Sequence, residues 1–153
     1  MFRSRSRGYS LTEMVMVVAC ILILTAAIVP VTRLGVQRQR EMELREDLRV
    51  VRNAIDDYKR LSDQGLIPIE VDTEGYPKNL EILVKGVELV GQLNKKRRFL
   101  RKIPVDPMTQ KAEWGLRSYQ DEPDSRSWGG QNVYDIYSLS DGTALDKTKY
   151  KDW

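Results

Sequence analysis

A single carboxylate, Glu13, lies at the front edge of a long apolar stretch. Every residue from Met14 to Val31 is uncharged, and most of them have aliphatic side chains. An ionised carboxylate in such surroundings is unfavourable unless a cationic group pairs with it. The chemistry that this position suggests is therefore ion pairing, and we expect Glu13 to have a cationic partner.

The residue types that serve most often in catalysis are scarce. The chain has no histidine, which removes the usual general base and the commonest zinc ligand. Its one cysteine, Cys20, lies inside the apolar stretch, so an intrachain disulfide is impossible and the thiol is expected to be a small apolar side chain. We therefore expect no enzyme. The alternative, if the protein is an enzyme, is a membrane-anchored hydrolase that uses Asp135 or Asp141.

The net charge of the chain comes from its first residues. Without Arg3, Arg5 and Arg7, the 25 basic residues fall to 22 and balance the 22 acidic ones. The sequence pI of about 9.0 is thus a property of the N-terminus and does not indicate a nucleic-acid-binding domain. The one strongly basic cluster further on, residues 94–102, is expected to be a solvated face or a subunit contact.

The distribution of charge and hydropathy divides the chain into two parts. Its 153 residues suffice for one modest domain with an appendage, and the mean hydropathy of −0.46 shows that the part outside the apolar stretch is polar. About 20 apolar residues can cross a bilayer as a helix, and basic residues before such a helix stay in the cytoplasm. We therefore expect a single membrane-spanning segment with the C-terminal part on the far side.

Three interpretations of the N-terminus remain open on these grounds. One is a cleaved secretory signal with a cut near Thr25, Ala26 and Ala27, and another is a plain signal anchor. Neither of the two uses Glu13 or Gly8. The third interpretation uses both residues and comes from a resemblance.

The stretch RGYSLTEMVMV resembles the leader of type IV prepilins and type II secretion pseudopilins, in which a basic leader ends in glycine and a glutamate stands at the fifth position after the cut. The resemblance implies that a prepilin peptidase cleaves between Gly8 and Tyr9 and then N-methylates Tyr9. The family usually has phenylalanine and threonine where this chain has Tyr9 and Ser10. Pro30 stands where many members have a proline that distorts the helix.

The resemblance gives Glu13 a specific partner. In a helical filament, Glu13 of one subunit can face the new Tyr9 amine of its neighbour. A subunit out of register leaves this carboxylate unpaired, and breaking a buried ion pair costs about 3 to 5 kcal/mol. The resemblance therefore makes Glu13 and Pro30 assembly residues, with Glu13 fixing the register.

Beyond the apolar stretch, the sequence predicts an amphipathic helix. Leu44, Leu48, Val51, Ile55, Tyr58 and Ser62 recur at steps of three and four, which indicates one buried face, and Gly65 is a stop signal. Pairs at i,i+4 spacing such as Glu41 and Arg45 are expected to stabilise the solvent-facing side.

The C-terminal part predicts short elements. We expect a short helix whose apolar side chains pack into the domain: Leu80, Leu83, Val84 and Val87. Residues 114–119 and 133–139 are rich in aromatic and branched side chains and predict two strands. We expect them to form one small antiparallel sheet against the buried face of the helix, because few strands are stable without such cover.

The same region is similar to the globular domain of the major, G-type pseudopilins. The matching features are a turn at 103–107, Trp114, the strand 134–138 and the Asp141-Gly142 loop. In that family the final loop commonly binds calcium. The resemblance implies Ser138, Asp141, Thr143 and Asp146 as calcium ligands, with Asp141 and Asp146 foremost; otherwise Asp141-Gly142 is simply a turn.

Together these expectations give an α+β, type IV pilin-like fold. Its domains are a cleaved leader (1–8), a transmembrane and filament-core helix (9–32), a helical stalk (33–62) and a globular periplasmic domain (63–153). The expected function is that of a structural subunit of the type II secretion pseudopilus, a periplasmic filament that drives export of folded proteins. The alternative is a type IV pilin of a surface filament for adhesion, motility or DNA uptake.

The expected location and partners follow from the same resemblance. The location is the bacterial inner membrane, crossed once. The expected partners are further copies of the chain, a prepilin peptidase, an inner-membrane assembly platform with its ATPase, and minor pseudopilins; no nucleic acid is expected.

Overall fold

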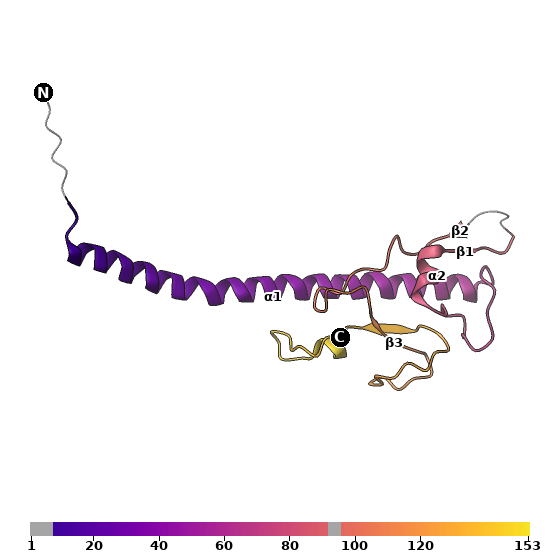
Figure 1. Ribbon diagram of the computed structural model, residues 1–153. Helices are drawn as coiled ribbons and strands as arrows, with labels where there is room; N and C mark the ends of the chain where they lie inside the picture. Colours follow the sequence, from indigo (N-terminus) through magenta and orange to yellow (C-terminus); the bar gives the residue numbers. More distant parts are fainter. Residues whose placement is uncertain (1–7, 92–95) are drawn as a thin grey trace, which may run out of the picture. The chain divides into compact units, whose positions relative to one another are not determined.

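The structure, a computed structural model, describes residues 8–91 and 96–153, and for residues 26–33 it describes the backbone alone. Its elements are α1 (Leu11–Asp63), α2 (Leu80–Lys85), β1 (Val87–Glu88), β2 (Lys96–Arg97), β3 (Gly115–Arg117), β4 (Asp135–Tyr137) and the 3-10 helix η1 (Tyr150–Asp152) (Figure 1). The chain forms two compact units, Met1–Arg38 and Gln39–Trp153, and α1 contributes residues to both.

In the N-terminal unit, α1 begins directly after Ser10, whose carbonyl accepts the backbone N–H of Met14 at 3.1 Å. The hydroxyl of Thr25 donates to the carbonyl of Ile21 at 2.6 Å, so this polar side chain is satisfied within the helix. The apolar side chains from Leu11 to Leu24 are exposed, among them Leu11 (82%) and Ile23 (71%). The N-terminal unit therefore does not cover its own apolar surface.

The predicted membrane-spanning segment is not found. Within the described residues, no helix meets the length and apolarity that a membrane crossing requires. The predicted transmembrane helix and the single-pass inner-membrane location are therefore wrong.

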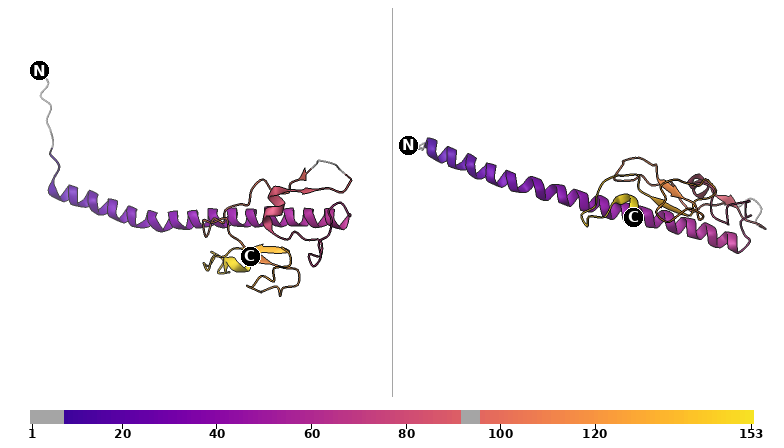
Figure 2. Two further views of the ribbon diagram at one scale, coloured as in Figure 1. Left: turned by 45° about the vertical axis from the view of Figure 1, so that its right-hand side comes forward. Right: turned by 90° about the horizontal axis from the view of Figure 1, so that it is seen from below.

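In the C-terminal unit, the core is built on one face of α1. Leu44, Val51 and Ile55 are fully buried and Leu48 is 2% exposed, as the spacing predicted. Side chains from α2, β4 and the C-terminal segment join them in a single cluster. Figures 1 and 2 show these later elements gathered around the C-terminal part of α1.

Helix α1 ends where the sequence predicts a stop. Gly65 has a φ of +71°, the left-handed conformation that glycine adopts without strain. Its N–H donates to the carbonyl of Ser62 at 2.9 Å, and the N–H of Leu66 donates to that of Leu61 at 3.0 Å. These bonds satisfy carbonyls that the helix leaves free at its end.

The strands form two separate antiparallel pairs. β1 pairs with β2, aligning Val87 with Arg97, and β3 pairs with β4, aligning Leu116 with Ile136. The prediction of one small sheet over 114–119 and 133–139 is therefore wrong in extent and in number, and with the missing membrane segment the predicted fold needs correction.

Side-chain hydrogen bonds explain why the β3–β4 pair is short. The N–H of Ser118 donates to the Asp121 carboxylate at 2.7 Å, and the N–H of Tyr119 donates to the Asn132 side-chain oxygen at 3.0 Å. These acceptors take up backbone donors that a longer ladder would use. The sequence pattern shows apolar spacing, but not this competition for backbone groups.

Two motifs that the sequence singles out meet in the fold. Asp106, from the turn at 103–107, accepts the Ser138 hydroxyl at 2.6 Å, and both side chains are fully buried. Asp106 also accepts the N–H of Met108 at 2.7 Å. The indole of Trp114 donates to the carbonyl of Pro104 at 3.0 Å. The turn is thus tied to β4 and to the residue before β3.

Gly115 is required by the ring of Tyr137. A Cβ built on Gly115 would fall among the Tyr137 ring atoms, so a larger residue fits only if the ring or the backbone moves. On β4, Tyr137 is 6% exposed, and the Arg117 guanidinium lies 4.5 Å from its ring centroid. Gly115 therefore fixes how closely β3 and β4 pack.

Replacing Gly115 by alanine should destabilise the C-terminal unit. We expect Gly115→Ala to lower the free energy of unfolding by about 1 to 3 kcal/mol, because the Tyr137 ring must move. Urea unfolding followed by tryptophan fluorescence measures the loss. Gly35→Ala, in α1 with no atom within 4 Å of the new methyl, is the control and should be neutral or stabilising. Equal losses in both variants would contradict the packing argument.

Candidate functional site

The predicted processing site lies at the start of the described chain. Gly8 and Tyr9 precede α1, and Tyr9 is 77% exposed. A Cβ at Gly8 would meet no atom within 4 Å, so the peptide bond between the two residues is open on the Gly8 side. Residues 1–7 of the predicted leader lie outside the described residues.

Glu13 occupies the first turn of α1 and is exposed. A negative charge at this end of a helix is favourable, because the unpaired N–H groups there give it a partial positive charge. With the described residues of its own chain, Glu13 forms no ion pair. The carboxylate is therefore accessible to a cation of another molecule.

Pro30 lies within α1, and the helix continues through it. Its side chain is outside the described residues. The assembly role implied for Pro30 stays a prediction.

The predicted calcium ligands have other partners. Ser138 donates to the buried Asp106, and Thr143 pairs through its backbone with Lys149. Asp141 accepts the ammonium group of Lys151 at 3.0 Å. Asp146 accepts Arg45 at 3.2 Å and the Thr148 hydroxyl at 2.5 Å.

These contacts determine the ionisation of the two aspartates. The hydrogen bond from Lys151 and its positive charge lower the pKa of Asp141. Hydrogen bonds from the hydroxyl and N–H of Thr148, helped by the Arg45 charge, lower the pKa of Asp146. Both groups are thus carboxylates at neutral pH, each facing its own cation of the protein.

The arrangement does not fit a calcium site as it stands. Calcium takes six to eight oxygen ligands, whereas Asp141 and Asp146 face different basic side chains and the Ser138 hydroxyl is turned into the core. Among the described residues there is no cluster of three or more acidic, cysteine or histidine side chains suited to a metal ion. Calcium binding stays a prediction, and it would require Lys151 and Arg45 to leave these carboxylates.

A polar contact that the sequence analysis missed holds the C-terminal segment to α1. Glu41 is only 8% exposed and accepts both the N–H of Leu145 and the hydroxyl of Tyr150 at 2.9 Å. The guanidinium of Arg45 lies 4.2 Å from the Trp153 ring centroid. The expectation that Glu41 serves the solvent-facing side of the helix is therefore wrong, whereas Arg45 is exposed as expected and contacts Asp146 and Trp153.

Arg52 extends this contact along α1. Its guanidinium donates to the Asp135 carboxylate at 2.6 Å, to the carbonyl of Ile136 at 3.1 Å and to the backbone oxygen of Trp153 at 2.6 Å. Asp135 thus bridges Arg52 and Arg117, the latter at 3.6 Å. The carboxylate considered for catalysis is held between two guanidinium groups.

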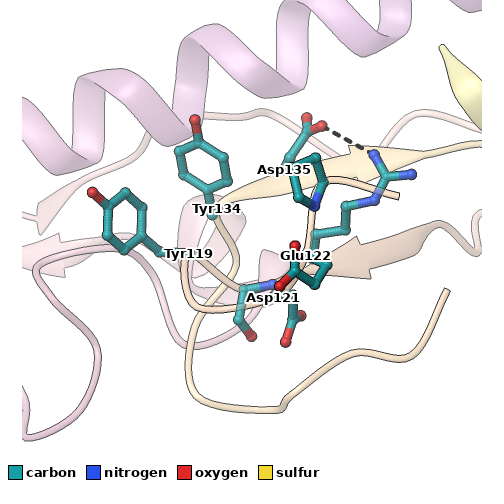
Figure 3. Close-up of a pocket in the computed structure, with 8 residues that line it drawn as sticks. Tyr119, Asp121, Glu122, Tyr134 and Asp135 are labelled. Carbon is teal, nitrogen blue, oxygen red and sulfur yellow. Dashed lines mark hydrogen bonds and ion pairs between the residues drawn. The ribbon is translucent and has the colours of Figure 1, made fainter. Parts of the chain in front are cut away.

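An open pocket of about 390 Å³ lies beside Asp135. Its lining combines exposed tyrosines with carboxylates, and Figure 3 shows the labelled members: Tyr119, Asp121, Glu122, Tyr134 and Asp135. Hydrogen bonds from the N–H groups of Ser118 and Gly129 lower the pKa of Asp121, so this group is ionised. No spacing of residues in the sequence indicates this pocket.

Comparison with protein-family models, with curated proteins and with solved structures finds no match in any of the three.

Glu41 should contribute more to the stability of the C-terminal unit than exposed carboxylates of the same helix do. Glu41→Ala removes an acceptor from a buried N–H and a buried hydroxyl, and we expect it to lower the free energy of unfolding by about 1 to 3 kcal/mol. Glu43→Ala, an exposed carboxylate on the same helix, should change it by less than about 0.5 kcal/mol. Thermal unfolding measures the stability of both variants against that of the unchanged protein. Similar stability of the two variants would show that the Glu41 contact does not hold the C-terminal segment.

Proposed function

We propose that this protein is a structural subunit of a type IV pilin-like filament, of the kind that forms the type II secretion pseudopilus and drives export of folded proteins. The observation that carries the proposal is that α1 contains an apolar segment, whose large side chains are at least half exposed, and continues into the compact C-terminal unit.

The exposed apolar side chains need a partner surface. They lie on all sides of the helix: Leu11, Met14, Val15, Met16, Val17, Val18, Ile21, Leu22, Ile23 and Leu24 are each at least half exposed. Contiguous apolar surface of this extent marks an interaction site. In a filament, copies of the same segment would cover one another along the axis.

Glu13 would supply one half of an ion pair in such a filament core. The Tyr9 amine exists only after cleavage at Gly8, which also removes Arg3, Arg5 and Arg7. In a core of packed helices, the amine of one subunit would then neutralise Glu13 of the next. An interaction worth several kcal/mol when broken would select one register among the many that uniform apolar packing allows.

The partners follow from the proposed assembly. They are further copies of the chain, a prepilin peptidase that cuts and methylates the N-terminus, an assembly platform with its ATPase, and minor pseudopilins. The exposed Gly8-Tyr9 bond supports the first processing step, because a peptidase must reach it.

The processing step is tested by mass spectrometry. Full-length protein expressed together with a prepilin peptidase should have a methylated Tyr9 as its first residue. Gly8→Ala provides the control and should leave the leader in place. An intact Met1 in the presence of active peptidase, or a start near Ile28, would refute the proposal.

The role of Glu13 is tested by incorporation into filaments. Glu13→Leu should still be cleaved, yet its share in sheared filaments should fall about tenfold or more, because an uncompensated Tyr9 amine remains in the core. Glu43→Leu removes an exposed carboxylate of the same helix outside the apolar segment and should incorporate normally. Normal incorporation of Glu13→Leu would refute the pairing.

A further inference from the structure

The pocket beside Asp135 combines two features that bind cations. We call it the acidic pocket; its lining consists of Arg117, Ser118, Tyr119, Asp121, Glu122, Pro123, Tyr134 and Asp135. The one cation among these residues, Arg117, is paired with Asp135 at 3.6 Å. Asp135 is paired with arginines of its own chain, whereas Asp121 accepts the N–H groups of Ser118 and Gly129 and has no ion pair with a described residue, and Glu122 is exposed. Two carboxylates of the pocket are therefore open to a positive charge from outside.

The tyrosines of the pocket expose their rings. Tyr119 is 54% exposed and Tyr134 46%, and their ring centroids lie 5.4 Å apart at an angle of 80°. Both pack on Tyr76, at 5.8 Å and 5.3 Å. The three rings contact one another and form an aromatic cluster. Figure 3 shows Tyr119 and Tyr134 beside the acidic residues.

This aromatic cluster already attracts a cation. The ammonium group of Lys59 lies 5.4 Å from the centroid of the Tyr76 ring. A positive charge over an aromatic face is stabilised by the negative potential there, and carboxylates nearby add to the effect. The exposed rings of Tyr119 and Tyr134 offer the same chemistry to a lysine or arginine of a partner.

A matching surface lies elsewhere on the same domain. The basic segment, as we call residues 96–102, carries the exposed cations Lys96, Arg97, Arg98, Arg101 and Lys102 and no acidic residue. Its one ion pair with a described residue is a long one, from Lys96 to Glu88 at 4.0 Å. Figure 1 shows the β1–β2 pair above α1 and β3 below it, and the segment and the pocket share no residue.

We propose that the acidic pocket of one copy binds the basic segment of a second copy. The occupant is a second copy because both surfaces belong to one chain, and because the chain without Arg3, Arg5 and Arg7 has balanced charge and no net repulsion between copies. The contact gives the basic segment a defined role.

The contact has a geometric consequence. Two different surfaces that bind each other link copies head to tail, and such heterologous contacts build open chains or rings rather than symmetric dimers. The inference rests on the proposed function in one respect: in a filament, this contact would join neighbouring globular domains. The contact itself needs no packing of the apolar helical segments.

Cross-linking between copies tests the contact. Full-length protein, in non-ionic detergent that covers the apolar segment, carries Cys20→Ser with Asp124→Cys beside the pocket and Lys102→Cys at the end of the basic segment. A short bis-maleimide should give a ladder of dimers, trimers and larger species. Chains with one of the two cysteines should stop at dimers. In the matched control, Arg49→Cys, an exposed basic position on α1, replaces Lys102→Cys.

The expected difference in cross-linking rate between the test pair and the control pair is large enough to measure on a gel. We expect the pair at 124 and 102 to link about fivefold faster than the control pair, as a cation on an aromatic and acidic site would give. Adding Glu122→Lys should return the rate to that of the control. Raising the salt from about 0.1 M to 1 M, which shortens the screening length from about 10 Å to about 3 Å, should do the same.

Each outcome decides the inference. Equal rates for the test and control pairs, or rates that neither Glu122→Lys nor salt reduces, would overturn it. A ladder from a chain that carries the wild-type Glu13 but forms no filaments supports the contact, and the proposed function then fails alone. Filaments of the wild-type chain without a ladder leave the proposed function intact and overturn the contact.

Discussion

The C-terminal unit depends on one apolar face of α1. Leu44, Leu48, Val51 and Ile55 are almost completely buried and contact the segments that follow. The two strand pairs consist of two and three residues per strand, too few to be stable by themselves. They persist because the helix supplies a ready apolar surface, so the helix is the template on which the rest of the unit is arranged.

Polar contacts along the edge of this face determine where the C-terminal segment lies. Glu41, Arg45 and Arg52 each reach a different part of residues 135–153, through a buried hydrogen bond, a cation–π contact and a bidentate ion pair. Apolar contact alone is not directional, whereas these bonds have fixed donors and acceptors. They make the segment adopt one position on the helix, and one of them brings Arg45 to Asp146, a carboxylate that was expected to bind calcium.

The same long helix faces two different environments. From Gln39 on, its apolar side is covered by its own chain, while the segment from Leu11 to Leu24 remains exposed. A subunit of this kind is stable in one part and incomplete in the other, and the incomplete part supplies the tendency to associate. In the proposed filament, Glu13 gives that association its register, and the contact between acidic pocket and basic segment extends it to the globular domains.

The sequence alone determined the features that depend on local spacing. The buried face of α1 follows from apolar residues at steps of three and four, its end follows from Gly65, and the positions of β3 and β4 follow from short aromatic and branched runs. These features depend on neighbours within a few residues, which a sequence displays directly. The expected membrane span is wrong, because within the described residues no helix combines the length and the apolarity that a crossing needs.

Only the tertiary structure decided which distant polar groups meet. The pairs Glu41 with Tyr150, Arg52 with Asp135, and Asp106 with Ser138 join residues between 32 and 109 positions apart. No periodicity marks such pairs, because a charged side chain at i,i+4 spacing looks the same whether it faces water or a later segment. The acidic pocket is hidden for the same reason: its tyrosines and carboxylates come from two strand ends and a loop that meet only when β3 and β4 pair on the helix.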